Sequence, residues 1–242
     1  MSLVDLGRIR RHDPANRRHQ TPHRRAERGR SVRHHLGAEH VDQFYLGACV
    51  GFSSVNLLNC APAWRSRVVF NRAIRYGKAG RTYLGNNDGI ASYSEATRRD
   101  PWPGEYPPED TGSSALGLGQ WWRDLGVVTA FDWVISGGMD PLIASVQRTP
   151  CLFGSYWFDD MFATDDGVLT SACEGAYNLD NTGGHEYLGS GVVWRGGRWW
   201  FVFEQSWGEE ASEFSPTFYM VDELVEHLIF DLAGDVMVPR LL

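Results

Sequence analysis

The spacing of apolar residues changes near the middle of the chain, and this change predicts helices first and strands later. From Ala48 to Cys60, apolar residues recur at steps of three and four, which is the period of one helix face. Pro62 ends this run, because proline interrupts a helix. The same spacing predicts helices over residues 63–76 and 90–98 and one ending near 126, the last two capped by Asp88 and by Ser113 or Ser114.

The second half of the chain has the pattern of strands. Runs rich in β-branched and aromatic residues are separated there by clusters of Gly, Asp and Asn. Helices followed by strands are typical of an α+β protein, so we predict a helical lobe over about 37–126 and a β-rich lobe over about 127–242. The runs predict strands over residues 127–134, 150–157, 184–194, 198–206 and 217–220, a short helix over 140–147, and a last helix over 223–232 capped by Asp222.

Residues 1–36 differ from both halves, because they hold ten arginines and only three acidic residues in a chain of net charge −7. We predict a basic N-terminal arm, which either lies extended on the acidic body or docks onto an acidic partner such as another virion protein. No aromatic residue interleaves with these arginines to stack on bases. Nucleic acid is therefore disfavoured as the partner.

Composition excludes several classes of protein. The 242 residues contain no run of about 18 apolar residues, the length of a membrane span. Residues 1–11 lack the apolar stretch of a secretory signal, so we expect a cytoplasmic or virion-associated location. The four cysteines form no C-x-x-C pair and are too few for a disulfide scaffold. We expect neither a metal nor a cofactor.

Four polar residues stand where nucleophilic catalysis would need them. Cys49 begins the first predicted helix, where the helix dipole lowers the pKa of a thiol and favours the thiolate. A thiolate nucleophile also needs a base and a group that orients the base. His185 opens one predicted strand, and Gln205 lies at the end of the next. Gln43, six residues before Cys49, could donate to an oxyanion.

These residues stand in segments that resemble the papain-like cysteine peptidase family. That family has a Gln six residues before a Gly-x-Cys helix start, a His that opens a strand about 130–150 residues later, and an Asn-Ser-Trp-Gly segment on the next strand. Here the segments read Gln-Phe-Tyr-Leu-Gly-Ala-Cys over 43–49, Gly-Gly-His-Glu-Tyr over 183–187 and Gln-Ser-Trp-Gly over 205–208. The Cys-to-His separation is 185 − 49 = 136 and the His-to-Gln separation is 205 − 185 = 20.

The resemblance spans about residues 37–242 and looks closest to a divergent bacterial and bacteriophage branch, where Gly-Gly-His-Glu and the Glu-Asp-Thr-Gly-Ser of residues 109–113 also occur. Two positions depart from the family pattern: Val50 replaces the usual Trp, and Gln205 replaces the usual Asn. The first departure changes the packing beneath the nucleophile. The second keeps a carboxamide but adds one methylene, which bears on how the imidazole is oriented.

The resemblance implies a two-lobed fold with its active site in the cleft between the lobes, and a peptidase that forms an acyl-enzyme. The implied catalytic residues are Cys49, His185 and Gln205. The Cys49 backbone N–H and the Gln43 side chain would stabilise the oxyanion. The implied substrate-binding residues are Gly112, Ser113, Gly184 and Trp207, with Trp207 also shielding the His185–Gln205 contact.

Three functions remain open from the sequence. The first is an active thiol peptidase or isopeptidase that acts on a polypeptide substrate. The second is a papain-like fold with weak or no catalysis, retained as a structural or binding component of a phage virion. The third is an endopeptidase that cleaves peptidoglycan, although the chain has no wall-binding repeat.

The pairing of the two strands that carry His185 and Gln205 gives a sharp structural expectation. A two-residue turn at Gly196–Gly197 would place Gln205 opposite Leu188, on the other face of the sheet from His185. The catalytic interpretation therefore predicts a longer loop or a bulge, with Gln205 opposite His185. It also predicts that the Gln205 amide oxygen accepts a hydrogen bond from His185 Nδ1.

Overall fold

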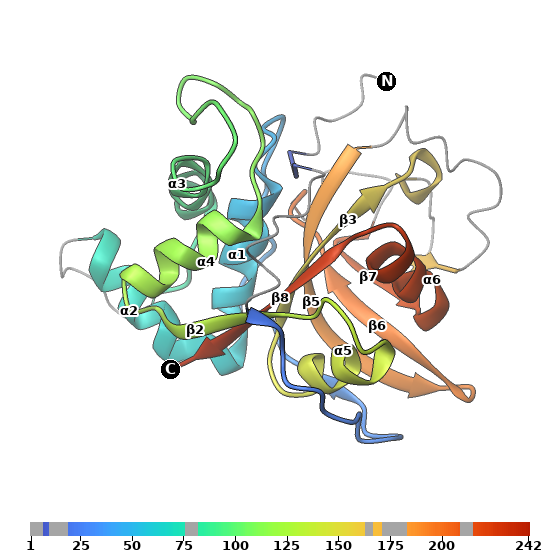
Figure 1. Ribbon diagram of the computed structural model, residues 1–242. Coiled ribbons are helices and arrows are strands. Elements are labelled where there is room, and N and C mark those ends of the chain that lie inside the picture. The colour runs from blue at the N-terminus through green and yellow to red at the C-terminus, as the bar shows by residue number, and fades with distance from the viewer. Residues whose placement is uncertain (1–6, 10–18, 76–81, 163–166, 171–182, 209–214) are drawn as a thin grey trace.

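The described residues in the first part of the chain are mostly helical (Figure 1). The computed structural model describes residues 7–9, 19–75, 82–162, 167–170, 183–208 and 215–242. Pro62 lies in a short 3₁₀ turn, Ala61–Ala63, which separates the first helix from the second as the sequence predicts. The helices are α1 (Cys49–Asn59), α2 (Trp64–Ile74), α3 (Asn86–Thr97) and α4 (Ala115–Asp124).

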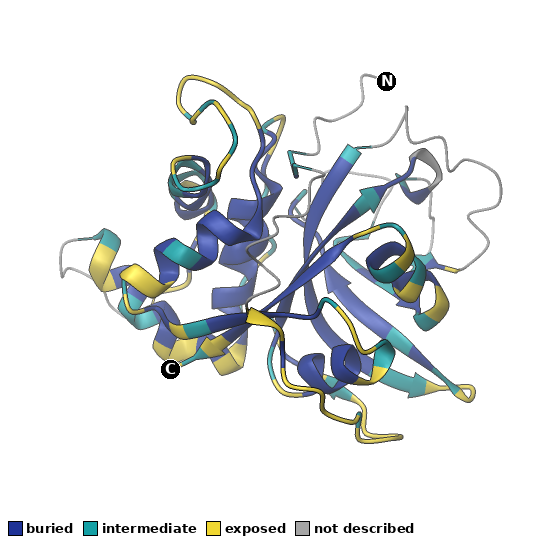
Figure 2. Ribbon diagram, viewed as in Figure 1, coloured by how far each residue is buried: buried dark blue, intermediate teal, exposed yellow. Residues whose placement is uncertain are grey.

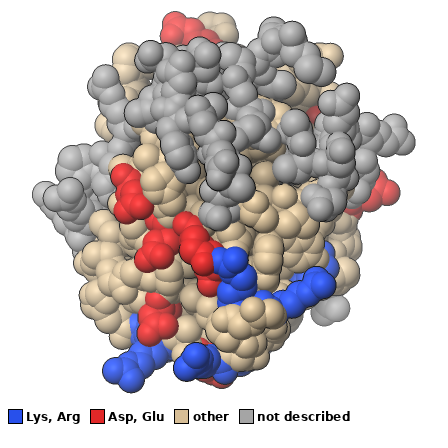
Figure 3. Space-filling model, turned by 90° about the vertical axis from the view of Figure 1, so that its right-hand side faces the viewer, with Lys and Arg blue, Asp and Glu red and all other residues tan. Residues whose placement is uncertain are grey.

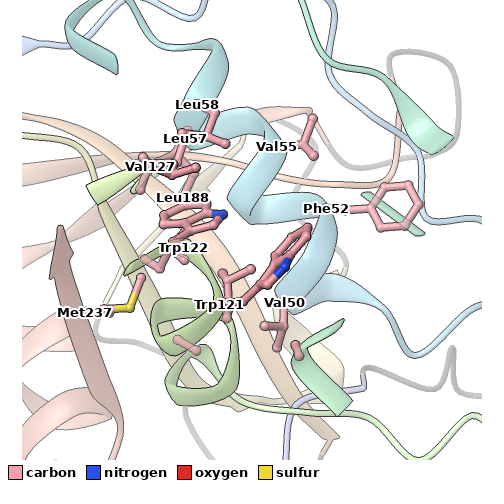
Figure 4. Packing of buried hydrophobic residues seen from close by; sticks show 14 of the residues in the cluster. Val50, Phe52, Val55, Leu57, Leu58, Trp121, Trp122, Val127, Leu188 and Met237 are labelled. Carbon is pink, nitrogen blue, oxygen red and sulfur yellow. The ribbon is translucent and has the colours of Figure 1, made fainter. Parts of the chain in front are cut away.

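Helix α1 lies at the centre of the molecule, and all of its residues are buried (Figure 2). In Figure 4, Trp122 of α4 and Leu188 and Met237 of the sheet lie on one side of α1, and Phe52 points away from them. A helix whose residues are all buried must be covered on every side. The position of α1 between helices and sheet therefore fixes where its first residue, Cys49, lies.

Helices α1 and α3 approach closely through two glycines. A Cβ added at Gly51 would lie 2.3 Å from the Gly89 carbonyl oxygen, and one added at Gly89 would lie 2.8 Å from the Phe52 ring. Such distances are far below van der Waals contact, so the two helices could not keep this separation with side chains there. The pair therefore sets the depth at which α1 sits.

We expect Gly51→Ala to lower the free energy of unfolding by about 1–3 kcal/mol, because the added methyl group forces α1 and α3 apart. Urea unfolding followed by tryptophan fluorescence measures the change. Gly85→Ala is the matched control, because a Cβ at Gly85 meets no atom within 4 Å. Equal midpoints for the two variants would show that the close contact is not needed.

The second part of the chain forms an antiparallel sheet, apart from one parallel pair. Its order is β2-β8-β3-β5-β6-β7-β4, and β1 also pairs with β5. Helices α5 (Met139–Val146) and α6 (Asp222–Glu226, followed by a π-helical turn to Asp231) pack against this sheet. The strands are β1 (Val32–Arg33), β2 (Val128–Trp133), β3 (Cys151–Trp157), β4 (Val168–Leu169), β5 (Gly183–Arg195), β6 (Arg198–Glu204), β7 (Thr217–Val221) and β8 (Asp235–Leu241).

The predicted α+β class, helices first and antiparallel strands later, is confirmed. The prediction missed β8, which lies between β2 and β3, as well as the two-residue strands β1 and β4. Helix α3 begins earlier than expected, at Asn86. Asp88 is not its cap but its third residue, where its carboxylate accepts from the Gly85 N–H at 2.9 Å. Likewise, Asp222 is the first residue of α6 and accepts from the Trp199 N–H.

The β5–β6 hairpin has both a two-residue turn and a bulge, which the sequence analysis treated as alternatives. Its tip has the two-residue turn, because Arg195 pairs with Arg198 on either side of Gly196–Gly197. The pairing then shifts by one residue at a bulge on Ser190, so that Gly189 faces Phe203. The predicted pairing of Gln205 directly with His185 is wrong. The bulge still moves Gln205 onto the same face as His185.

The described part of the basic arm lies on the protein itself. The Thr21 N–H donates to the Trp133 carbonyl at 2.8 Å, and the buried His34 donates through its backbone N–H to Ser190 at 2.7 Å. Strand β1 extends this contact along β5, so the arm supports the bulge from outside. The described residues of the arm therefore lie on the body, and docking onto an acidic partner stays a prediction.

In the described part of the face shown in Figure 3, acidic and basic side chains lie next to one another. Arg198 forms ion pairs with Asp222 at 3.3 Å and with Glu223. Exposed pairs of this kind contribute little to stability. Separately, none of the helices in the described part of the chain has the length and apolar character needed to cross a membrane.

Candidate active site

Cys49 is the first residue of α1 and is fully buried. Its sulfur accepts a hydrogen bond from the Glu186 backbone N–H at 3.4 Å, which joins the helix to β5 next to His185. Burial, together with the charge of Glu186, raises the pKa of the Cys49 thiol, although two backbone N–H groups and Arg8 oppose the shift. The expected lowering of this pKa by the helix dipole is therefore outweighed in this conformation.

His185 and Gln205 are joined by a short hydrogen bond. His185 Nε2 lies 2.6 Å from Gln205 Oε1, so the side chains meet as predicted, but through Nε2 rather than Nδ1. Trp207 stacks on the imidazole with ring centroids 4.9 Å apart, and Trp157 meets it edge-on at 5.0 Å. These rings cover the buried His185–Gln205 pair, which agrees with the shielding expected of Trp207.

Gln205 is held by its backbone as well as by its side chain. Its N–H donates to the Pro216 carbonyl at 2.8 Å, and its own carbonyl accepts from Asn56 Nδ2 at 2.9 Å. Asn56 lies two helical turns after Cys49 on α1, so one helix carries the thiol and fixes the strand end of Gln205. The sequence analysis missed Asn56; its signal is an asparagine within a run whose apolar spacing predicts a buried helix.

The Gln43 side chain lies close to the start of α1 in a fixed orientation. Its Oε1 accepts from Ser206 Oγ at 2.6 Å, and its Nε2 donates to the Leu46 carbonyl at 2.8 Å. The Gln43 backbone N–H also donates to the Ser206 carbonyl at 2.8 Å. An amide nitrogen carries two hydrogens, and the Leu46 bond uses one of them.

Asp110 joins two parts of the site that sequence reasoning treated separately. Its carboxylate accepts from the Gly47 N–H at 2.9 Å and from Tyr93 Oη at 2.6 Å. Tyr93 Oη in turn accepts from the Gly112 N–H at 2.9 Å. One carboxylate therefore fixes the loop before Cys49 relative to the loop that contains Gly112. A conformation-fixing role for Asp110 was not predicted, although its segment carried part of the family resemblance.

Residues 7–9 of the arm occupy the backbone groups that were expected to hold a substrate. The Ser113 N–H donates to the Gly7 carbonyl at 2.7 Å, and the Ile9 N–H donates back to the Ser113 carbonyl at 2.9 Å. On the other side, the Arg8 N–H donates to the Gly184 carbonyl at 3.0 Å. The arm therefore bridges the helical part and the sheet beside Cys49.

Glycines permit this close approach. Gly112 has φ +74°, and a Cβ on it would lie 2.2 Å from the Gly7 carbonyl oxygen. A Cβ on Gly7 would lie 1.8 Å from the carbonyl oxygen of Gly47, two residues before Cys49. Of the predicted substrate-binding residues, Gly112, Ser113 and Gly184 lie against the arm, whereas Trp207 packs on His185.

Among the described residues, no three His, Cys, Asp or Glu side chains lie close enough together to bind a metal ion. The nearest pair of buried carboxylates, Glu186 and Asp235, faces the guanidinium of Arg8. The chemistry that the residues around Cys49 can supply is a thiol, an imidazole held by an amide, and amide N–H donors.

Solved structures with the same fold are cysteine proteases. Xylellain, a cysteine protease from Xylella fastidiosa, matches with a TM-score of 0.55 and 19% identity over 99% of this chain and 97% of that one. Procathepsin L2 from the larval midgut of Tenebrio molitor matches with a TM-score of 0.55 and 15% identity over 98% of this chain and 78% of that one. Bromelain from Ananas comosus, in complex with E64, has a TM-score of 0.50 and 14% identity over 88% of this chain and 99% of that one.

These likenesses establish that the chain has a papain-like fold across its length. No protein-family model matches the sequence, and no curated protein matches it. At identities of 12–19% the likeness shows the fold alone.

Proposed function

We propose that this protein is a thiol peptidase that hydrolyses peptide or isopeptide bonds through an acyl-enzyme on Cys49. The observation that carries the proposal is the pair of contacts made by two consecutive residues of β5. His185 binds Gln205 through its side chain, while Glu186 binds the Cys49 sulfur through its backbone N–H. These two contacts support the proposal that an imidazole held by an amide serves the thiol at the start of α1, which is the arrangement that nucleophilic catalysis requires.

In this mechanism the Cys49 thiol gives its proton to His185, and the sulfur attacks the carbonyl carbon of the substrate. The Cys49 N–H and the remaining Gln43 amide hydrogen stabilise the negative oxygen that forms. The C–N bond then breaks, His185 protonates the leaving amine, and a thioester remains on Cys49. Water deprotonated by His185 cleaves the thioester and releases the acid. Gln205 acts as a positioning residue that keeps the imidazole in one orientation.

A papain-like fold with weak catalysis is the second candidate, and three observations favour it. Cys49 is fully buried, its thiol pKa is raised, and residues 7–9 lie on the backbone that would bind a substrate. A virion role and peptidoglycan cleavage stay predictions from the sequence. The two candidates differ in what happens when a reagent or substrate reaches Cys49, so they can be separated by experiment.

Labelling with E64, the inhibitor bound in the bromelain structure, tests the proposal directly. We expect stoichiometric labelling of native protein with the adduct mapped to Cys49, no labelling after denaturation, and no labelling or peptide hydrolysis in Cys49→Ala. Both the full chain and its Arg8→Ala form are assayed, because the arm lies beside the thiol. If neither form hydrolyses a peptide and Cys49 stays unlabelled in both, the result supports the second candidate.

A further inference from the structure

One arginine of the arm enters the interior, whereas the arm's other described arginines are exposed. Arg8 is only 7% exposed. Its Nη2 donates to Asp235 Oδ2 at 3.0 Å, and its Nε lies 3.6 Å from Glu186 Oε2. A buried arginine of this kind needs a charged partner, and here the fold supplies two.

The two carboxylates come from neighbouring strands and stand in one row across the sheet. Gly154 of β3 pairs with Glu186 of β5 on one side and with Asp235 of β8 on the other. Directly opposed residues share a face, so both carboxylates flank the position of Gly154. We call Glu186, Gly154 and Asp235 the acidic row.

The middle of the acidic row is a space that only glycine leaves open. A Cβ on Gly154 would lie 2.1 Å from Arg8 Nε and 2.7 Å from Glu186 Oε2. The Arg8 side chain therefore lies directly over Gly154, between the carboxylates. The absence of a side chain at this position is what admits a long cationic side chain.

The carboxylates are costly to bury without a cation. Burial and the nearby charge of Asp235 raise the pKa of Glu186, and the Arg8 charge opposes that shift. Among the described residues, neither Glu186 side-chain oxygen has a hydrogen-bond partner, and Arg8 reaches it only as an ion pair. The Arg8 guanidinium thus makes one hydrogen bond to Asp235 and an ion pair with Glu186, and another guanidinium in the same place could make both contacts.

The backbone of Arg8 is held where a bound polypeptide would be held. Its N–H donates to the Gly184 carbonyl, and its two neighbours bond to Ser113. A substrate that uses these same backbone groups would place a side chain over Gly154. Arg8 therefore marks the position of one substrate residue relative to Cys49.

We infer that the acidic row is a recognition site for an arginine side chain of the polypeptide substrate, and that Arg8 fills it in the absence of substrate. That the bound arginine belongs to a substrate rests on the proposed peptidase function. That the acidic row binds a guanidinium does not depend on it. Arginine fits better than lysine, because its planar fork presents separate nitrogens to Asp235 and Glu186, whereas an ammonium is a single point charge.

The first test measures binding without catalysis. Full-length Arg8→Ala protein is titrated with agmatine, a small guanidine, and with pentylamine by calorimetry. We expect agmatine to bind Arg8→Ala protein, to bind the wild type at least about tenfold more weakly because Arg8 competes, and to exceed pentylamine in affinity. Adding Asp235→Asn or Gly154→Ala should remove the binding. Equal agmatine affinity with and without Asp235→Asn would overturn the inference.

The second test measures selectivity in the Arg8→Ala background. Fluorogenic peptides are varied at one position at a time between arginine and norleucine. At one position of the peptide we expect kcat/KM to be higher with arginine than with norleucine. The ratio of these two kcat/KM values should fall by roughly tenfold or more in Asp235→Asn. The ratio within one variant cancels any change in thiol reactivity. An unchanged ratio with intact turnover overturns the inference, whereas agmatine binding without any turnover rejects the proposed peptidase and keeps the guanidinium site.

Discussion

Displacing residues 7–9 should raise the rate at which Cys49 reacts with iodoacetamide by about 10- to 100-fold. The thiol is fully buried, and the arm crosses beside it between Ser113 and Gly184. A hydrogen bond to a charged group contributes about 1.5–3 kcal/mol, and each 1.4 kcal/mol is a factor of ten in the population of the open form. Arg8→Glu should release the arm, because it places a third carboxylate against Glu186 and Asp235.

A second variant should displace residues 7–9 through a steric clash rather than through charge. Gly7→Val keeps Arg8, but its Cβ would fall 1.8 Å from the Gly47 carbonyl oxygen, at a backbone with φ +66° that valine avoids. Mass spectrometry of the alkylated protein gives the rate at each thiol. Cys60 and Cys151 are internal references, because both are buried and burial raises the pKa of each thiol. Cys173 lies outside the described residues.

Arg25→Ala is the matched control, since Arg25 is an exposed arginine of the same arm. Its Cys49 rate should equal that of the wild type. If Arg8→Glu and Gly7→Val both fold and both leave the Cys49 rate unchanged, residues 7–9 do not limit access to the thiol. If Cys60 accelerates together with Cys49, the variants have loosened the whole fold rather than the arm.

Gln205→Ala should lower kcat/KM for a peptide about 100-fold, with a much smaller effect on the alkylation of Cys49. The Gln205 amide oxygen lies 2.6 Å from His185 Nε2 and fixes the imidazole. Misplacing a reacting group by about 1 Å costs on the order of 100-fold in rate. Alkylation by a small reagent needs the thiol but not a protonated imidazole aimed at a leaving amine. The measurement pairs steady-state kinetics with the alkylation rate, in the Arg8→Ala background.

Gln205→Asn separates orientation from packing. It keeps the carboxamide but shortens the side chain by one methylene, so it should recover part of the lost turnover. Gln120→Ala, which removes a half-buried glutamine from α4, should leave turnover unchanged. Turnover in Gln205→Ala within twofold of the Arg8→Ala parent would exclude Gln205 as a positioning residue and leave a Cys49–His185 pair alone.

Local patterns in the sequence were enough to predict the elements that hold Cys49. The apolar spacing after Gly47 and the proline at position 62 define α1 within one or two residues, because helix periodicity and helix ends are set by near neighbours. Asn56 could not be found in this way. Its partner, the Gln205 carbonyl, is 149 residues distant in sequence, and no local signal reports such a contact.

Strand β8 was missed for a physical reason. Its residues alternate between apolar and polar only briefly, and Pro239 removes a backbone donor, which is typical of edge strands. The strand nevertheless lies inside the sheet, where Pro239 pairs with Phe131 of β2. Because β8 begins with Asp235, missing the strand also meant missing one of the two carboxylates of the acidic row.

Arg8 could not be distinguished from the other arginines of the arm by sequence alone. Ten arginines lie among residues 1–36, and their neighbours do not mark one of them for burial. The partners of Arg8 lie 178 and 227 residues away, so only the tertiary fold selects it.

The bulge at Ser190 has a consequence for how the length of this hairpin can change. A two-residue turn pairs position 195 with 198, so facing positions at the tip have numbers that add to an odd value. The residue numbers 185 and 205 are both odd, so the two side chains share a face only where facing positions have numbers that add to an even value. The one unpaired residue, Ser190, makes this sum even on the side of the bulge where His185 and Gln205 lie. An insertion or deletion of one residue between 185 and 205 would therefore move one of the two side chains to the opposite face. Inserting one residue into each strand between Ser190 and the turn would keep both side chains on the same face. The tip of the hairpin can therefore lengthen or shorten by two residues at a time, one in each strand.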